Sequence, residues 1–287
     1  MRSLAVFVAL LAMLPISAAK DELQVGDLVK QHLNSIGTEQ ARAAVKTRVA
    51  EGTVQFRILS GGTGTQDGKQ VFISEGRKLV TLLKLPNPSY HGERFVSDGT
   101  KTFITNITPG AYSNFGLLVH MHDEILTEGL WGGTLSTGWA LANLEDRHAK
   151  LRYEGLKKVD GRELHRVSYT PSKRTDLEIE LYFEPETFRH VMTTYELTIN
   201  PQLARTEREN AGQQSTHYRI EERFSDFQDT DKLSLPRRWI VQFTSEVPQN
   251  QYHPTLGVAQ ASVTEFNTIE TSISHNVTLD PKNFEVK

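Results

Sequence analysis

The residues of this chain that most suggest chemistry lie at positions 120–124, where the sequence is His-Met-His-Asp-Glu. Two histidines beside two acids can bind zinc when their side chains converge on one metal ion. The apolar residues around this stretch follow helical spacing, and in a helix His120 and His122 point about 200° apart around the axis. We therefore expect no metal site here, and we interpret the stretch as the end of a helix.

A serine between two glycines raises the question of a nucleophilic hydrolase. A nucleophile elbow requires the pattern G-x-S-x-G, in which the serine stands on a sharp turn between a strand and a helix. Gly133 and Gly138 flank Ser136, but the spacing before the serine is one residue too long. We expect no catalytic residues, and a hydrolase that uses Ser136 and His122 is the least favoured alternative.

Two further patterns resemble known sites and fail on their details. The glycine-rich stretch 61–69 would form a phosphate-binding loop only with glycine at Thr63 and a hydroxyl residue at Gln70. Glu178 and Glu180 could act as paired carboxylates, but they alternate with apolar residues on a predicted strand, so we expect both to face water. The sequence thus predicts no cofactor.

Composition excludes several classes of function. The chain has no cysteine, so no disulfide or thiolate metal site can stabilise it, and the residue that would carry a lipid anchor is absent. Its formal net charge is −3, which gives no electrostatic basis for nucleic-acid binding. We expect no nucleic-acid partner.

The first nineteen residues have the composition of a signal peptide. Arg2 provides the positive start, residues 4–16 the apolar middle, and Ser17-Ala18-Ala19 the small residues before a cleavage site. The apolar run is shorter than the roughly 20 residues needed to cross a bilayer, so we expect no integral membrane segment in the mature chain. The sequence predicts an exported protein, periplasmic, or secreted where there is no outer membrane, with residues 20–287 as one domain.

The elements that would position any site change character early in the chain. Residues 25–33 follow helical spacing with Gly37 as a stop, and Thr38 is expected to cap a second short helix. From Thr53 to Ile58 the pattern changes to the two-residue period of a half-buried strand. Asp98-Gly99 predicts a hairpin with a type I′ turn.

The rest of the chain is predicted to be mostly strand. We expect a flexible turn region that includes Gly61–Gly64 and Asp67-Gly68, and a helix followed by a mobile apolar loop over residues 112–133. The strands expected after that loop lie at residues 177–183, 191–199, 218–227, 239–243 and 262–266.

The order of these pieces resembles a known superfamily. Two short helices end near Gly37, a strand opens at Gly52, the Ser97–Lys101 hairpin follows, and a middle helix precedes paired strands and a late turn at Asp226–Pro236. This layout, over residues 25–247, is similar to that of the periplasmic lipoprotein-carrier (LolA-like) superfamily. The resemblance implies a mainly β fold with helices (α+β): an incomplete, strongly curved antiparallel β-barrel closed by short helices, here with a C-terminal extension after about residue 247.

The resemblance also implies a function. Several members of the superfamily shelter acyl chains on the concave apolar face, so the leading hypothesis is a carrier with a lipid or acylated ligand. The alternative is a non-catalytic envelope interaction or sensor module with a filled core and a protein partner. Apolar residues near Gly129, Gly132 and Gly133 suit a loop that opens over a cavity. The candidate cavity or gate residues are Phe115, Leu117, Leu118, Leu130 and Trp131.

Overall fold

The structure is a computed structural model that describes residues 23–106, 112–200, 215–247 and 260–286. In this part of the chain, twelve strands form one sheet whose neighbours are all antiparallel. The strands are β1 (Thr47–Ser60), β2 (Gly64–Glu75), β3 (Lys78–Lys84), β4 (Gly92–Ser97), β5 (Thr102–Asn106), β6 (Lys150–Val159), β7 (Arg162–Thr170), β8 (Glu178–Phe183), β9 (His190–Ile199), β10 (Thr216–Thr230), β11 (Leu233–Val247) and β12 (Gln260–His275).

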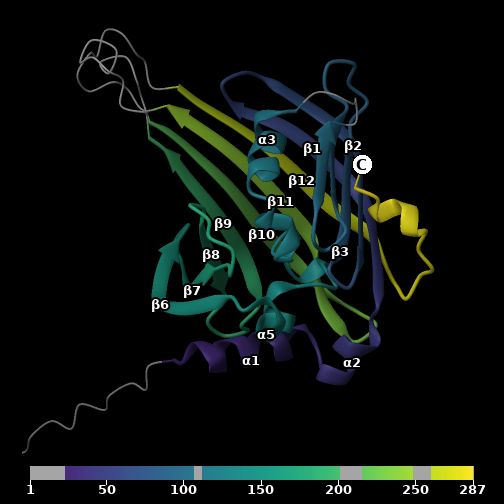
Figure 1. Ribbon diagram of the computed structural model, residues 1–287, viewed down its shortest axis with the longest axis vertical. Helices are drawn as coiled ribbons and strands as arrows, with labels where there is room; N and C mark the ends of the chain where they lie inside the picture. Colours follow the sequence, from purple (N-terminus) through teal and green to yellow (C-terminus); the bar gives the residue numbers. More distant parts are fainter. Residues whose placement is uncertain (1–22, 107–111, 201–214, 248–259, 287) are drawn as a thin grey trace, which may run out of the picture.

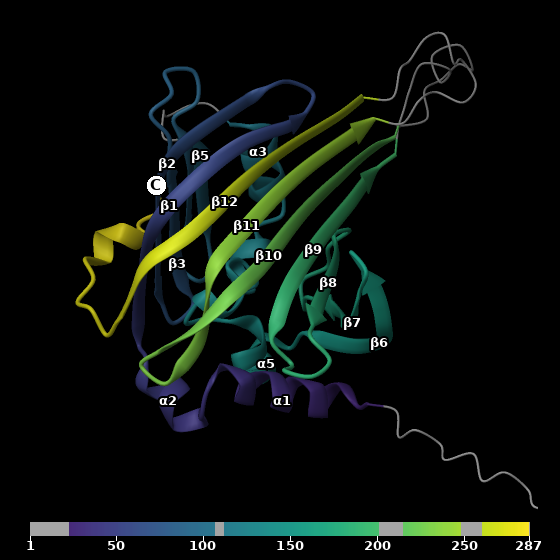
Figure 2. The ribbon, with the colours of Figure 1, turned by 180° about the vertical axis from the view of Figure 1, so that it is seen from behind.

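The order of the strands is β5-β4-β3-β2-β1-β12-β11-β10-β9-β8-β7-β6. Each half is a meander of neighbouring hairpins, and β12 joins the halves by pairing with β1 on one side and β11 on the other. The strand formed after residue 247 therefore lies in the middle of the sheet (Figure 2). The sheet is curved and open, with β5 and β6 as its two edges, which confirms the predicted fold class (Figure 1).

The chain must cross the sheet to connect its two edge strands, and residues 112–149 do so; we call them the crossing segment. They form α3 (Asn114–Met121), α4 (Glu124–Thr127), α5 (Leu144–Arg147) and the 3₁₀ turns η1 (Gly133–Leu135) and η2 (Ala140–Asn143). Figure 1 shows this segment in front of the strands, and Figure 2 shows the strands in front of it. It therefore covers one face of the sheet, the concave face.

Two N-terminal helices lie across one end of the sheet (Figure 1). They are α1 (Val25–Ile36) and α2 (Glu39–Ala44), as the sequence predicted. Gly37 separates them at a φ of 153°, and a Cβ there would lie 2.7 Å from the carbonyl oxygen of Lys232, so the glycine permits a close approach to the sheet. The Thr38 hydroxyl accepts a hydrogen bond from the Ala41 amide at 3.2 Å, which confirms the predicted cap.

Aromatic side chains fill the space between the crossing segment and the sheet. Trp131 lies 5.2 Å from Trp239 and 5.3 Å from Phe95 between ring centroids, and Phe115 lies 5.7 Å from Phe266. These rings belong to the main buried cluster of the described chain. The 3₁₀ turn η3 (Pro281–Phe284) covers a smaller cluster with Val80 and Val96.

Three local predictions are wrong in detail. Asp67-Gly68 lies inside β2, where a Cβ on Gly68 would approach the Lys84 carbonyl oxygen to 2.2 Å, so this glycine serves a close strand contact instead of a turn. The hairpin at Asp98-Gly99 is present, but its turn is not of type I′, because that type requires a positive φ at Asp98 and Asp98 has none. Instead, the Asp98 carboxylate accepts hydrogen bonds from the Thr100 and Lys101 amides. The single middle helix is divided into α3 and α4.

A bulge in β12, opposite Gly52 of β1, provides a test of the close packing at the centre of the sheet. The register between β1 and β12 shifts at Glu51/Gly52, and a Cβ on Gly52 would lie 2.1 Å from the Ile269 carbonyl oxygen. We expect Gly52→Ala to lower the free energy of unfolding by about 1–3 kcal/mol because backbone must move. Gly26→Ala in α1 is the control, because nothing lies within 4 Å of its Cβ. Urea unfolding of both variants should show a loss only for Gly52→Ala.

Candidate functional site

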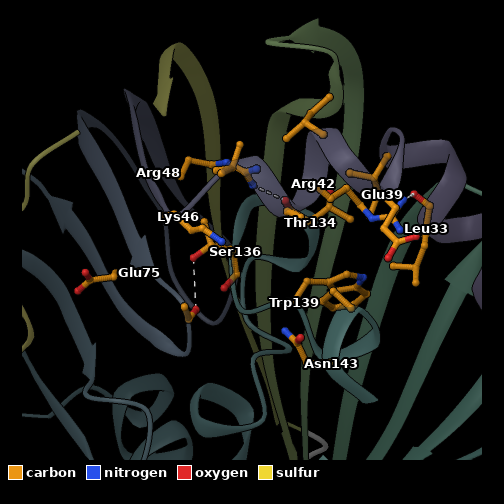
Figure 3. A pocket seen from close by; sticks show the side chains of 17 residues that line it. Leu33, Glu39, Arg42, Lys46, Arg48, Glu75, Thr134, Ser136, Trp139 and Asn143 are labelled. Atoms are coloured by element: carbon orange, nitrogen blue, oxygen red, sulfur yellow. Dashed lines mark hydrogen bonds between the residues drawn. The ribbon is translucent and has the colours of Figure 1, made fainter. Parts of the chain in front are cut away.

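A pocket of about 870 Å³ lies between α1–α2 and the crossing segment, at the end of the sheet where β1 begins. We call it the end pocket (Figure 3). Its lining combines apolar, hydroxyl and charged side chains. The lining residues are Leu33, Ile36, Glu39, Arg42, Ala43, Val45, Lys46, Arg48, Glu75, Gly76, Thr134, Ser136, Thr137, Trp139, Ala142, Asn143 and Leu233.

A buried arginine holds the strand side of the end pocket. Arg48 is only 3% exposed, and its Nη1 donates to the carbonyl oxygens of Thr134 at 2.7 Å and Leu135 at 2.9 Å. Its Nε donates to Nε2 of His275 at 3.0 Å, and the other ring nitrogen of His275 contacts Asp231 at 2.8 Å. Burial lowers the pKa of Arg48 to about 10. The side chain therefore joins β1 to η1 of the crossing segment through neutral acceptors.

A second arginine closes the helix side. Nη1 of Arg42 donates to the carbonyl oxygens of Leu33, at 2.6 Å, and Gly37. These are carbonyls at the C-terminal end of α1, which a cation stabilises. Of the two acids that line the pocket, Glu75 contacts Lys78 at 3.1 Å, and Glu39 lies near Arg42 and Leu33 (Figure 3). Arg42 is therefore committed to the helix end.

Trp139 forms the aromatic wall of the end pocket. Its Nε1 donates to Nε2 of His32 at 2.9 Å, and Nδ1 of His32 donates to the Phe188 carbonyl at 2.9 Å. Burial lowers the pKa of His32 to about 4, so the ring is neutral and can accept the indole proton. The Trp139 ring also lies 4.7 Å from the His190 ring. These contacts fix the indole in position.

The residues considered for hydrolysis lie in separate networks. Oγ of Ser136 accepts from the Gly138 amide at 3.1 Å, and no histidine of the described chain forms a hydrogen bond with it. His122 follows α3 at its C-terminal end, as predicted, and its Nδ1 contacts Oε1 of Glu124 at 3.1 Å. The structure thus does not pair Ser136 with His122. Within the described residues, no group of three His, Cys, Asp or Glu side chains could hold a metal ion.

The structure brings together four of the five predicted gate residues. These four belong to the main buried cluster: Phe115, Leu118, Leu130 and Trp131. The centroids of the Phe115 and Trp131 rings lie 6.0 Å apart. Leu117 is 43% exposed on α3. None of the five lines the end pocket. All five lie on the part of the crossing segment that covers the concave face of the sheet.

Two buried carboxylates attach the crossing segment to the sheet. Oε1 of Glu222 accepts from the Gly132 amide at 2.8 Å and from Trp239 Nε1 at 3.0 Å, and Oε2 accepts from the Tyr195 hydroxyl at 2.7 Å. Glu93 accepts from the hydroxyl of Ser113, which caps α3. Burial raises the pKa of both carboxyls to about 7.

Glu222 and Arg48 were not predicted as functional residues from the sequence, although the two-residue alternation of their strands places both at buried positions. Glu222 lies between Ile220 and Phe224 in the two-residue period of β10, which places it on their buried face. Arg48 shares a face with Ala50 of β1 in the same way. A charged residue at a core position of an alternating strand indicates a buried polar contact.

Buried carboxyls should make the protein less stable as the pH rises above neutrality. Burial raises the pKa of Glu93 and Glu222 to about 7 and that of Glu270 to about 8, so each holds a proton in the folded state that the unfolded chain releases near 4.5. The lowered pKa values of His32, His165, His190 and His275 act in the opposite direction, mainly below pH 6.5. We expect the free energy of unfolding to fall by about 2 kcal/mol from pH 6.5 to 8.

Urea unfolding across this interval measures the slope. Glu270→Gln should remove the largest part of it, because Glu270 has the highest of the three carboxyl pKa values. A stability that is level or rises between pH 6.5 and 8 in the unsubstituted protein would contradict the assignment.

Comparisons with known proteins give matches among solved structures. No protein-family model matches this chain, and no curated protein matches it either. Among solved structures, a LolA superfamily protein from Nitrosomonas europaea is 11% identical, with 92% of this chain and 98% of that chain covered and a TM-score of 0.44. A putative outer membrane lipoprotein-sorting protein domain from Vibrio parahaemolyticus is also 11% identical, with 89% and 97% covered and a TM-score of 0.41. The lipoprotein LppX from Mycobacterium tuberculosis is 9% identical, with 90% and 100% covered and a TM-score of 0.22.

Proposed function

We propose that this protein is an exported binding or carrier protein that shelters an acyl chain or another lipid-like ligand, and that the ligand enters at the end pocket. The observation that carries the proposal is the pocket itself. Its volume of about 870 Å³ lies within the range of about 300–1,000 Å³ that small-molecule sites occupy. Apolar residues of α1, α2 and β11 and the fixed indole of Trp139 line the pocket together with charged and hydroxyl groups. Such a lining suits an amphiphile.

The crossing segment would act as a cover in this proposal. The aromatic rings beneath it occupy the concave face, so an acyl chain longer than the end pocket could extend only by displacing them. Phe115, Leu118, Leu130 and Trp131 would move with the segment, and Leu117 would remain at its surface. Gly129, Gly132 and Gly133 are all at positive φ and are positions at which the backbone can turn.

Export is proposed from the leader sequence, which lies outside the described residues. A periplasmic location follows from that leader in a cell with an outer membrane. Within the described part of the chain, no helix is both long enough and apolar enough to cross a membrane. We propose no enzymatic activity, because the polar groups of the end pocket do not form a nucleophile–base pair.

Two neighbouring alanines allow a matched test of the pocket. Ala43 lines the end pocket and Ala44 does not, and both are exposed on α2. We expect Ala43→Trp to weaken binding of a fluorescent fatty acid about tenfold, because the indole occupies ligand volume and about 1.4 kcal/mol of binding energy is lost. Ala44→Trp should bind like the unsubstituted protein. Fluorescence titration measures both.

Three outcomes would count against the proposal. These are the absence of any amphiphile in organic extracts of the purified protein, the failure of fatty acids to bind, and equal binding by Ala43→Trp and Ala44→Trp. The last result would place the ligand elsewhere.

One observation favours a second candidate, a non-catalytic interaction or sensor module. The rings of Trp131, Trp239 and Phe95 already fill the concave face beneath the crossing segment. In this case the protein would bind an envelope protein and no lipid. Crosslinking that captures a single envelope protein, together with a lack of amphiphile binding, would favour this candidate.

A further inference from the structure

Four hydrogen-bond donors meet on the strand side of the end pocket. Lys46 immediately precedes β1 and Arg48 is the second residue of that strand, and both line the pocket. Thr134 and Ser136 of the crossing segment line it next to them. Figure 3 shows Arg48, Lys46, Thr134 and Ser136 together, with Trp139 below them. An ammonium, a guanidinium and two hydroxyl groups can all donate to a single acceptor.

Among the described residues, no carboxylate contacts either cation directly, and Asp231 reaches Arg48 only through the ring of His275. Neither Lys46 nor Arg48 forms an ion pair with a described residue, and the acceptors bound by Arg48 are two carbonyl oxygens and an imidazole nitrogen. A buried charge is ordinarily paired, because leaving water without a partner costs free energy. Among the acids of the pocket, Glu75 is engaged by Lys78, and Glu39 lies on the helix side. The strand side is therefore positive.

The hydroxyl groups have unused hydrogen-bonding capacity. Thr134 is 5% exposed, and its Oγ1 has no hydrogen-bond partner within the described chain. Buried hydroxyl groups are almost always paired. Oγ of Ser136 accepts from Gly138, and no described residue accepts the Ser136 proton. An anionic group with several oxygen atoms, placed between these hydroxyl groups and the cations, would accept hydrogen bonds from them.

We propose that the strand side of the end pocket binds the anionic headgroup of a single-chain amphiphile, at Lys46, Arg48, Thr134 and Ser136. This inference rests on the proposed function and gives it a ligand class. The hydrocarbon chain lies along Trp139 and the apolar residues of α1. Carboxylate and phosphate headgroups share the required chemistry, because both present several acceptor oxygens with negative charge.

Ligands that share one chain length and differ in headgroup test the proposal. The probes are dodecanoate, dodecyl phosphate, neutral monolauroylglycerol and cationic dodecyltrimethylammonium, each titrated below its micellar concentration, and inorganic phosphate. We expect one or both anionic amphiphiles to bind about tenfold tighter than the neutral one, and the cationic one to bind weakest. The relative affinities of dodecanoate and dodecyl phosphate identify the headgroup. Inorganic phosphate alone should bind far more weakly than dodecyl phosphate.

The outcomes separate this inference from the proposed function. Equal binding of anionic and neutral amphiphiles overturns the anion site and leaves a lipid-binding pocket. Inorganic phosphate that binds as tightly as dodecyl phosphate also overturns the inference, because the site would then be an ion site without a role for the chain. Failure of all the amphiphiles to bind overturns both proposals.

Charge substitutions locate the headgroup. Lys46 is exposed, so Lys46→Glu should fold normally, which a thermal melt checks. We expect it to weaken binding of the anionic amphiphile about tenfold or more and to leave the affinity for monolauroylglycerol unchanged. Lys30→Glu, on the exposed face of α1 away from the pocket, is the matched control and should change neither affinity. Equal effects of the two substitutions would overturn the assignment to Lys46.

Discussion

Trp131→Ala is expected to lower the free energy of unfolding by about 3–5 kcal/mol. The indole is fully buried, with Phe95 at 5.3 Å, Trp239 at 5.2 Å and Phe115 at 6.0 Å between ring centroids. Its Nε1 donates to Oγ1 of Thr81 at 3.0 Å. The substitution removes the ring that connects the crossing segment to both halves of the sheet, and it leaves a cavity and a hydroxyl without its partner.

Chemical denaturation at constant pH measures this loss. Leu117→Ala is the control because Leu117, another of the predicted gate residues, is half exposed on α3. Its substitution should change stability by about 0.5 kcal/mol or less. A loss below about 1 kcal/mol for Trp131→Ala would mean that the crossing segment is not packed against the sheet as the structure describes.

Glu222→Ala is expected to cost about 3–5 kcal/mol, since three buried donors lose their acceptor. The Gly132 amide, the Trp239 indole and the Tyr195 hydroxyl all donate to this carboxyl group. Glu222, on β10, therefore connects Gly132 of the crossing segment with Tyr195 of β9 and Trp239 of β11. The effect should be a cooperative loss of stability, visible as a lower midpoint of urea unfolding.

Glu222→Gln is the matched control. The amide retains the size of the side chain and an acceptor oxygen for Gly132 and Trp239, and its NH₂ group can donate to the hydroxyl oxygen of Tyr195. We expect a loss of about 1 kcal/mol or less, together with a shallower fall in stability between pH 6.5 and 8. Equal losses for Glu222→Ala and Glu222→Gln would show that the hydrogen bonds do not hold the segment.

The Glu222 substitutions also test how the crossing segment affects ligand binding. If the crossing segment is a cover, loosening it should change access to the concave face more than the shape of the end pocket. Glu222→Gln keeps an acceptor for Gly132, and Arg48 still holds the Thr134 carbonyl at the end pocket. We therefore expect Glu222→Gln to retain binding of short amphiphiles, whereas Ala43→Trp weakens it about tenfold.

The sequence by itself determined the local elements. The helical spacing of residues 25–33, the stop at Gly37 and the cap at Thr38 depend only on residues a few positions apart, and α1 and α2 form as predicted. The alternation of apolar and polar residues likewise indicated β1 and the strands from β8 to β12. The turn at Asp98 was correctly placed but its type was not, because the Asp98 carboxylate binds the loop amides.

Only the tertiary structure decided how these elements are joined and where an opening remains. Strand β12, from the end of the chain, pairs with β1 near its beginning, and no short-range pattern specifies such a pairing. The end pocket collects residues from α1–α2, the start of β1, the crossing segment and Leu233. Burial and hydrogen bonding depend on neighbours that are distant in sequence, so alternation could mark Arg48 and Glu222 as core positions but could not identify their partners.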